Sequence, residues 1–313
     1  GLGTGAQRIA DSITKMSNGA LKIKLYAAGE LVPAFESFDA VRDNSAQLYH
    51  ASPYYWINKN KSTPFFGAVP GGLTAQEHNA WIKYAGGQQL WDELYSNFGL
   101  KSFSAGNSGT QMGGWFRKEI NGLDDFKGLK MRIPGLAAEV LNRMGGTAVA
   151  MPGGEIMPSL QSGAIDATEW VGPWNDLAFG FHKITKFYYG PGFHEPSSSL
   201  ECCLNLSSYN SLPDDLKSIV QHACSAENDR MLSEFTAANN QAQRKLVDEH
   251  NVTIQKFPKD VFDNMMRHSS DVVASTANEG EINKRIYNSW SKFKSEARER
   301  APFAEQGYME ARS

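Results

Sequence analysis

An arginine at the end of a short apolar run is the first feature of this sequence suited to binding chemistry. Apolar residues alternate along residues 129–133, so a strand here places Arg132 on the opposite face, just before Pro134 ends it. The planar guanidinium can hold a carboxylate through two parallel hydrogen bonds. The pattern therefore predicts an anchor for a carboxylate, and a structural ion pair is the alternative interpretation.

Two oxygen-bearing side chains lie in unusual segments on either side of this arginine. Gln111 is part of a run rich in small residues, 107–117, and Glu169 opens the stretch Glu-Trp-Val-Gly-Pro-Trp-Asn-Asp at 169–176. Amide and carboxylate oxygens suit a hard cation. A tight strand turn with a packed tryptophan, and a helix start with a tryptophan cluster, are the respective alternatives.

Catalytic signatures are absent from the sequence. There is no G-x-S-x-G, H-E-x-x-H or P-loop, and the seven histidines show no zinc-like spacing. The loop around Glu195 supplies one more acid, and the neighbouring His194 is interpreted as a satisfied loop histidine. An enzyme that acts on a small acid with Glu169 and His194 remains the alternative from another functional class.

Composition narrows the class of protein. The 313 residues carry 31 Lys and Arg against 34 Asp and Glu, a net charge of −3, with no basic block, so we expect no nucleic-acid partner. The sequence contains no run of 18 apolar residues, so we expect no transmembrane helix. The three cysteines are too few for a disulfide framework, and we expect them to be small buried hydrophobes.

Strand and helix patterns alternate through the first two thirds of the chain, which predicts an α/β fold. Strands are expected at 21–26, 47–51, 101–105, 111–117, 129–133, 147–151, 164–169 and 252–257. Helices are expected at 6–16, 35–42, 76–98, 137–143, 155–161, 214–250, 259–274 and 282–301. The long helices of the last third predict a bridging element and a helical tail.

Several of these motifs together resemble one known family, the periplasmic solute-binding proteins of TRAP transporters (DctP type). Residues 160–167 are similar to its L-Q-x-G-x-x-D signature, and residues 128–134 to its strand with a carboxylate-binding arginine. Residues 111–116, 151–156 and 169–176 resemble the branch that binds 2-oxo acids, lactate and related monocarboxylates. The resemblance implies a two-lobed fold with a ligand cleft between the lobes, in the periplasm.

The same resemblance implies roles for individual residues. Arg132 is expected to pair with the ligand carboxylate. A sodium or calcium ion is expected beside the ligand, and the residues implied around it are Gln111, Glu169, the Trp170 backbone carbonyl and, less clearly, Glu195. Asn175 and Tyr54 or Tyr55 are expected to line the pocket. These assignments imply a binding protein and no enzyme.

The resemblance also implies an organisation and partners. Lobe I is expected to comprise residues 1–106 and 206–250, lobe II residues 107–205 and 251–280, and the tail residues 281–313. Membrane permease subunits are the expected partners, and residues 282–301 are a candidate homodimer interface, with packing on their own lobe as the alternative. Because the chain starts at a helix, we expect the family's first strand to be missing.

Overall fold

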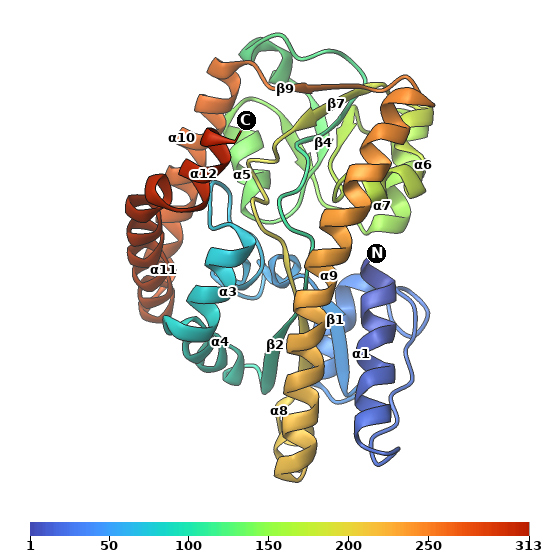
Figure 1. Ribbon diagram of the computed structural model, residues 1–313, viewed down its shortest axis with the longest axis vertical. Helices are drawn as coiled ribbons and strands as arrows, with labels where there is room; N and C mark the ends of the chain where they lie inside the picture. The colour runs from blue at the N-terminus through green and yellow to red at the C-terminus, as the bar shows by residue number, and fades with distance from the viewer. Residues whose placement is uncertain (313) are drawn as a thin grey trace.

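Two separate β-sheets organise the protein, of which this computed structural model describes residues 1–312. The first sheet is antiparallel, with strand order β1-β8-β2. Its strands are β1 (Leu48–Ala51), β8 (Ser199–Asn205) and β2 (Leu100–Asn107). In Figure 1 this sheet lies in the lower part of the molecule, beside α1 (Leu2–Met16) and the lower half of the long helix α9 (Asp214–Asp248).

The second sheet has six strands in the order β5-β4-β6-β3-β7-β9. They are β5 (Thr147–Val149), β4 (Lys130–Arg132), β6 (Ala167–Thr168), β3 (Gly114–Phe116), β7 (Phe187–Gly190) and β9 (Thr253–Lys256). Strands β5, β4 and β6 run parallel, whereas β3 is antiparallel to both of its neighbours. The expected α/β fold with two lobes is therefore confirmed.

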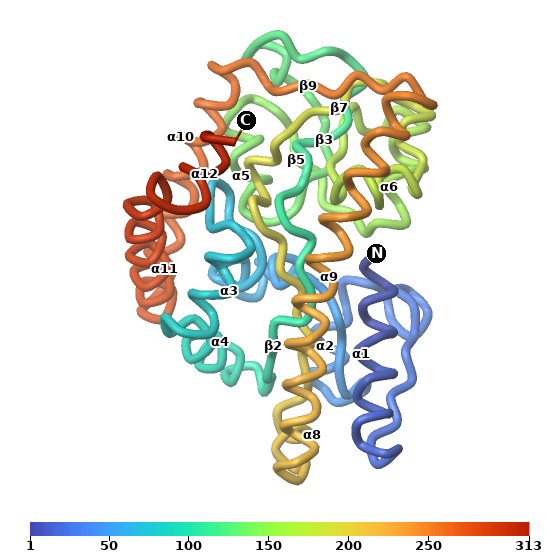
Figure 2. Tube along the Cα trace, viewed as in Figure 1, coloured from blue at the N-terminus to red at the C-terminus, as the bar shows by residue number. Residues whose placement is uncertain are grey.

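Three connections join the two sheets. Residues 108–113 lead from β2 to β3, residues 191–198 lead from β7 back to β8, and α9 then runs from the first lobe to β9 in the second. Figure 2 shows the two thin connections passing close to each other behind α9. Backbone hydrogen bonds join them, from Gly192 N to Gln111 O at 2.8 Å and from Gln111 N to Glu195 O at 3.0 Å. Side chains on these connections therefore lie at the junction of the lobes.

Helices cover both sheets. On the first lobe they are α1, η1 (Ala34–Glu36), α2 (Ser37–Arg42), η2 (Pro53–Trp56), η3 (Thr63–Phe66), α3 (Ala75–Tyr84), α4 (Gly87–Ser96) and α8 (Leu206–Asn210). On the second they are η4 (Leu123–Phe126), α5 (Leu136–Arg143), α6 (Gly153–Ser162), α7 (Pro173–Phe179), η5 (Phe181–Lys183) and α10 (Lys259–Ser275). None of the helices in residues 1–312 combines the length and apolar character needed to cross a membrane.

The tail packs on its own chain. After η6 (Thr276–Glu279), α11 (Glu281–Arg300) lies against α3 and α4, and it is followed by η7 (Ala301–Phe303) and α12 (Glu305–Ala311). Trp290 stacks edge-on against Phe65 at 5.3 Å between ring centroids, and Trp81 Nε1 donates to Ser289 Oγ at 3.1 Å. The apolar stripe of α11 is thus buried within the monomer.

The structure corrects the expected strands and one lobe boundary. No strand forms at residues 21–26; Leu21 and Ile23 pack on the cluster between α1 and the first sheet, so their alternation reports one-sided burial and no strand pairing. Strands β7 and β8 were not expected. Residues 199–205, assigned above to lobe II, form β8 at the centre of the first sheet instead. The three cysteines are free and buried, as expected.

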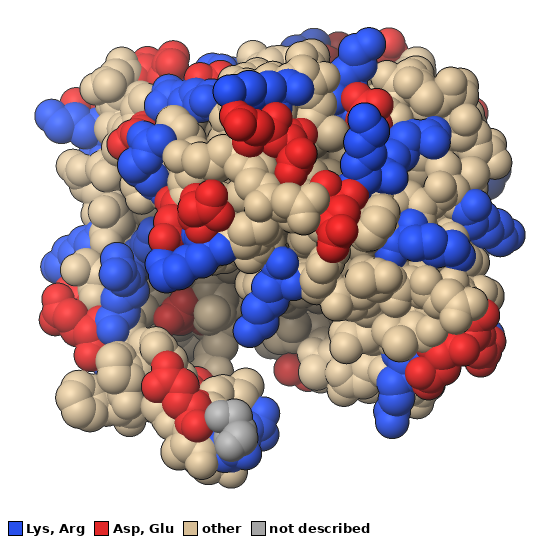
Figure 3. Space-filling view, turned by 90° about the horizontal axis from the view of Figure 1, so that it is seen from above, with Lys and Arg blue, Asp and Glu red and all other residues tan. Residues whose placement is uncertain are grey.

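The face of the molecule seen in Figure 3 carries lysines and arginines interspersed with aspartates and glutamates. A mixed surface of this kind does not attract a polyanion.

Candidate functional site

Arg132 and Glu169 form a buried ion pair at the edge of the second sheet. Arg132 ends β4, and Glu169 directly follows β6, the parallel neighbour in which Thr168 pairs with Arg132. The carboxyl ends of parallel strands meet at one edge of a sheet, which brings the two side chains together. Arg132 Nη1 donates to Glu169 Oε1, and the side chains are only 1% and 0% exposed.

Further contacts fix the guanidinium from both lobes. Its Nε donates to Met151 O and its Nη2 to the hydroxyl of Tyr55, each at 3.3 Å, and its central carbon lies 5.3 Å from the centre of the Trp170 ring. Burial alone would lower the pKa of Arg132, but the charge of Glu169 and the tyrosines outweighs it and raises the pKa. The arginine therefore stays charged, on a surface that both lobes share.

The connections between the lobes bring two more side-chain oxygens, which could coordinate a cation, close to Arg132 and Glu169. Gln111 is 4% exposed; its Nε2 donates to Ser108 Oγ at 3.1 Å, and its Oε1 has no hydrogen-bond partner within residues 1–312. Glu195 is 3% exposed, and in the same part of the chain its Oε2 is likewise without a partner. Buried polar atoms are almost always satisfied, so these unpartnered oxygens point to a group that binds there.

A cation fits this set of side-chain ligand atoms. One ligand atom each of Glu169, His194 and Glu195 lies within 4.8 Å of the others. Burial, reinforced by the charge of Glu169, raises the pKa of Glu195 to about 7. A nearby positive charge would favour the ionised form of both acids. The unpartnered oxygens of Gln111 and Glu195 add neutral and anionic ligands of the kind that Na⁺ and Ca²⁺ prefer.

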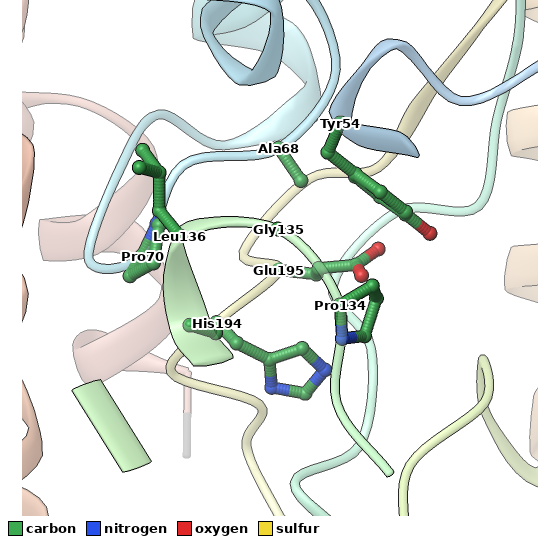
Figure 4. A pocket seen from close by; sticks show the side chains of 9 residues that line it. Tyr54, Ala68, Pro70, Pro134, Gly135, Leu136, His194 and Glu195 are labelled. Carbon is green, nitrogen blue, oxygen red and sulfur yellow. The ribbon is translucent and has the colours of Figure 1, made fainter. Parts of the chain in front are cut away.

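Two small pockets open beside these residues, and Tyr54 lines both. One encloses about 180 Å³ next to the start of α5, between Tyr54, His194 and Glu195. Figure 4 shows Glu195 between the other two in this view. The second encloses about 260 Å³. It is lined by Leu2, Tyr54, Tyr55, Ser108, Gln111, Trp170, Val171, Ser198 and Leu200.

The loop after Glu169 is held by a buried carboxylate. Asp176 Oδ1 accepts from the backbone N–H groups of Val171 and Gly172, both at 3.1 Å, and its Oδ2 accepts from Trp115 Nε1 at 2.9 Å and Tyr188 OH at 2.7 Å. Burial raises the pKa of Asp176 to about 6. This cage fixes the turn that carries Trp170.

The residues proposed from sequence are mostly brought together. Arg132, Glu169, Gln111, Glu195, Trp170, Tyr54 and Tyr55 all lie at the junction. Asn175 lies on α7 of the second lobe beside Gly1 of the first, and it is not among the residues that line the two pockets, so its place in the site stays a prediction.

Two participants were not assigned to the binding site from sequence: His194, interpreted there as a loop histidine or as the partner of Glu169 in an enzyme, and the Met151 carbonyl. His194 Nε2 lies 3.2 Å from Glu169 Oε2, and burial would lower the pKa of His194, but the hydrogen bond to Glu169 raises it. The sequence feature that could have pointed to His194 is the adjacent Glu195. The Met151 carbonyl had no side-chain signal at all.

Comparison with known proteins decides the family. Residues 2–279 match the model of bacterial extracellular solute-binding protein family 7, DctP. The chain belongs to this family. It is 39% identical over 295 residues to a monocarboxylate 2-oxoacid-binding periplasmic protein of Nostoc sp., which covers 94% of this chain and 81% of the relative.

Two solved structures of the family are also similar. A TRAP periplasmic solute-binding protein from Pseudoalteromonas atlantica, with bound sodium and pyruvate, has a TM-score of 0.95 and 39% identity over 99% of this chain and 94% of its own. A TRAP solute-binding protein from Bordetella bronchiseptica, a dimer with calcium and picolinate in one active site, has a TM-score of 0.97 and 34% identity over 99% and 92%.

Proposed function

We propose that this family 7 protein captures a small monocarboxylate, a 2-oxo or 2-hydroxy acid such as pyruvate or lactate, between its lobes. The observation that carries the proposal is the burial of Arg132 at the junction, in contact with Tyr55 of the other lobe. A carboxylate that takes bonds from Arg132 bridges the two lobes. Ligand binding then favours the closed arrangement, because only that arrangement completes the contacts.

A sodium or calcium ion is the proposed companion of the ligand. Gln111, Glu169, Glu195 and the Trp170 carbonyl are the proposed ligands, supported by the unpartnered oxygens of Gln111 and Glu195. The bound ion supplies positive charge for the carboxylate and the 2-oxygen of the acid. The relatives with sodium and pyruvate, and with calcium and picolinate, support this assignment.

Calorimetry tests the two parts separately. We expect pyruvate or lactate to bind the purified protein, and affinity or thermal stability to fall after exhaustive chelation and replacement of Na⁺ by a large organic cation. Unchanged affinity and stability after that treatment would contradict the metal assignment. Absence of binding to any small 2-oxo or 2-hydroxy acid would contradict the ligand assignment.

An enzyme acting on a small acid is the second candidate, favoured by the 3.2 Å contact between His194 and Glu169. Against proton transfer, Glu169 Oε1 is already occupied by the ion pair with Arg132. Incubation with a panel of 2-oxo and 2-hydroxy acids distinguishes the two: a binding protein returns each acid unchanged, whereas an enzyme forms product.

Delivery to a TRAP permease in the periplasm completes the proposal. Membrane subunits would recognise the closed form, in which the two lobes meet. The proposed lobes have the residue ranges predicted from sequence, except that β8 belongs to the first lobe. The TRAP relatives and the periplasmic Nostoc protein support this placement.

The helical tail is the proposed homodimer contact. Because α11 buries its own apolar stripe, the exposed side chains beyond it are the better candidates: Phe303, Tyr308 and Met309 are 91%, 67% and 54% exposed. The dimeric Bordetella relative supports the proposal. Sedimentation should show a dimer that a variant with serine at all three positions converts to monomer; an unchanged mass would contradict the interface.

A further inference from the structure

A buried acid in the first lobe lies outside the site described above. Glu201 is 0% exposed in β8, and its carboxyl accepts four hydrogen bonds. The donors are Tyr49 OH at 2.9 Å, Trp56 Nε1 at 2.8 Å, Tyr95 OH at 3.2 Å and Ser102 Oγ at 2.6 Å. They come from β1, η2, α4 and β2. Within residues 1–312, no cationic side chain forms an ion pair with it.

A buried carboxyl is costly unless hydrogen bonds satisfy it, so Glu201 and its four donors must be held in a fixed arrangement. One donor connects it to the ligand site. Trp56 belongs to η2, and the two residues before it are Tyr54, which lines both pockets, and Tyr55, which accepts from Arg132 Nη2 at 3.3 Å.

The geometry of η2 makes this connection effective. Residues in a 3₁₀ turn project about 120° apart, so fixing Trp56 fixes the directions of Tyr54 and Tyr55. The turn has no side-chain cap and begins at a proline. Short 3₁₀ turns have weak internal hydrogen bonds, so an external contact must hold their rotation.

We propose that Glu201 is a positioning residue for ligand binding: through Trp56 it fixes η2 and so holds Tyr54 and Tyr55 at the junction with Arg132. The inference rests on the proposed function only for its ligand readout. It assigns a role in binding to an acid that touches no ligand.

Paired variants of the full chain separate positioning from stability. Trp56→Phe and Tyr95→Phe each remove one donor to the same Glu201 oxygen, Oε1, but α4 carries none of the site residues. We expect both to lower the melting temperature. Only Trp56→Phe should weaken pyruvate binding in calorimetry, by about fivefold, the equivalent of one net hydrogen bond.

Equal weakening by Tyr95→Phe, or unchanged affinity in Trp56→Phe, would overturn the proposal. Crystal structures of the two variants give a second readout without ligand. The contact between Tyr55 and Arg132 should be lost in Trp56→Phe and kept in Tyr95→Phe; its retention in both refutes positioning. If the wild-type protein binds no pyruvate, the proposed function fails, and these structures still decide the role of Glu201.

Discussion

Replacement of Arg132 tests the site most directly, because it changes stability and binding by separable amounts. Arg132→Met leaves the carboxyl of Glu169 without its ion-pair partner in a place where it is 0% exposed. Removing one partner of a buried pair costs about 3–5 kcal/mol. The loss should lie near the lower end, because His194, 3.2 Å from the other oxygen, can still donate to Glu169. Glu169→Gln leaves the arginine uncompensated and should lie near the upper end.

The double variant removes both charges, so its loss should be smaller than the sum of the single losses. Three acceptors of Arg132 remain without their donor, Met151 O, Glu169 O and Tyr55 Oη, each previously at 3.3 Å. At about 1 kcal/mol each, they set the expected loss at about 3 kcal/mol. Urea denaturation of the four proteins measures this coupling.

Binding should follow a different pattern. A carboxylate held by two charge-assisted hydrogen bonds of about 1.5–3 kcal/mol each loses about 3–6 kcal/mol, or roughly 10²- to 10⁴-fold in affinity, in both variants that lack Arg132. Calorimetry with pyruvate measures it. The reasoning is wrong if Arg132→Met keeps its affinity, or if the double variant is destabilised by the full sum of the single losses.

Three further predictions concern the surrounding residues. In the fold, burial raises the pKa of Glu201 from 4.5 to about 7, so the folded chain holds this proton more tightly than the unfolded chain. Its stabilising contribution is complete below pH 4.5 and is lost as the pH rises through about 7. The free energy of unfolding of the wild type, relative to that of Glu201→Gln, should therefore fall over this pH window in urea titrations. A difference that stays constant with pH would contradict the prediction. Val171→Phe should narrow the larger pocket and weaken binding of 4-methyl-2-oxopentanoate about tenfold more than that of pyruvate in competition assays; equal effects would exclude Val171 from the ligand's path. Asp176→Ala strands the Trp115 and Tyr188 donors and should cost about 2–5 kcal/mol in thermal denaturation, whereas a loss below 1 kcal/mol would refute the cage.

The sequence alone could identify Arg132 and Glu169 because both positions follow short apolar runs with recognisable ends. It could not pair them. Their contact depends on β4 and β6 being neighbours in a sheet whose order is β5-β4-β6-β3-β7-β9, and that order depends on contacts between residues far apart in the chain. The same limit left His194 outside the predicted binding site, because it reaches Glu169 only through residues 191–198, which cross between the lobes.

The local sequence pattern also led to two errors: it predicted a strand at residues 21–26 that does not form, and it missed strand β8. Residues 21–26 alternate like a strand, but pairing needs a neighbour, and alternation alone records which side is covered. Strand β8 was overlooked because Ser199, Glu201 and Asn205 interrupt its apolar pattern, although every residue in it is buried. Its polar side chains find their partners only in the folded first lobe: Ser199 Oγ donates to Gly106 O and Asn205 Nδ2 donates to Val41 O, whereas Glu201 accepts.

The buried pair gives a physical reason for a cation in the proposed function. A ligand carboxylate that takes Arg132 must compete with Glu169, which already accepts from the same guanidinium, and it must approach Glu195 as well. One arginine cannot balance three carboxylates where the two glutamates are 0% and 3% exposed. A cation held by the two glutamates and Gln111 removes that conflict, because it neutralises Glu169 and frees the arginine for the ligand. Ligand and cation should therefore strengthen each other's binding by the same factor, as linkage requires.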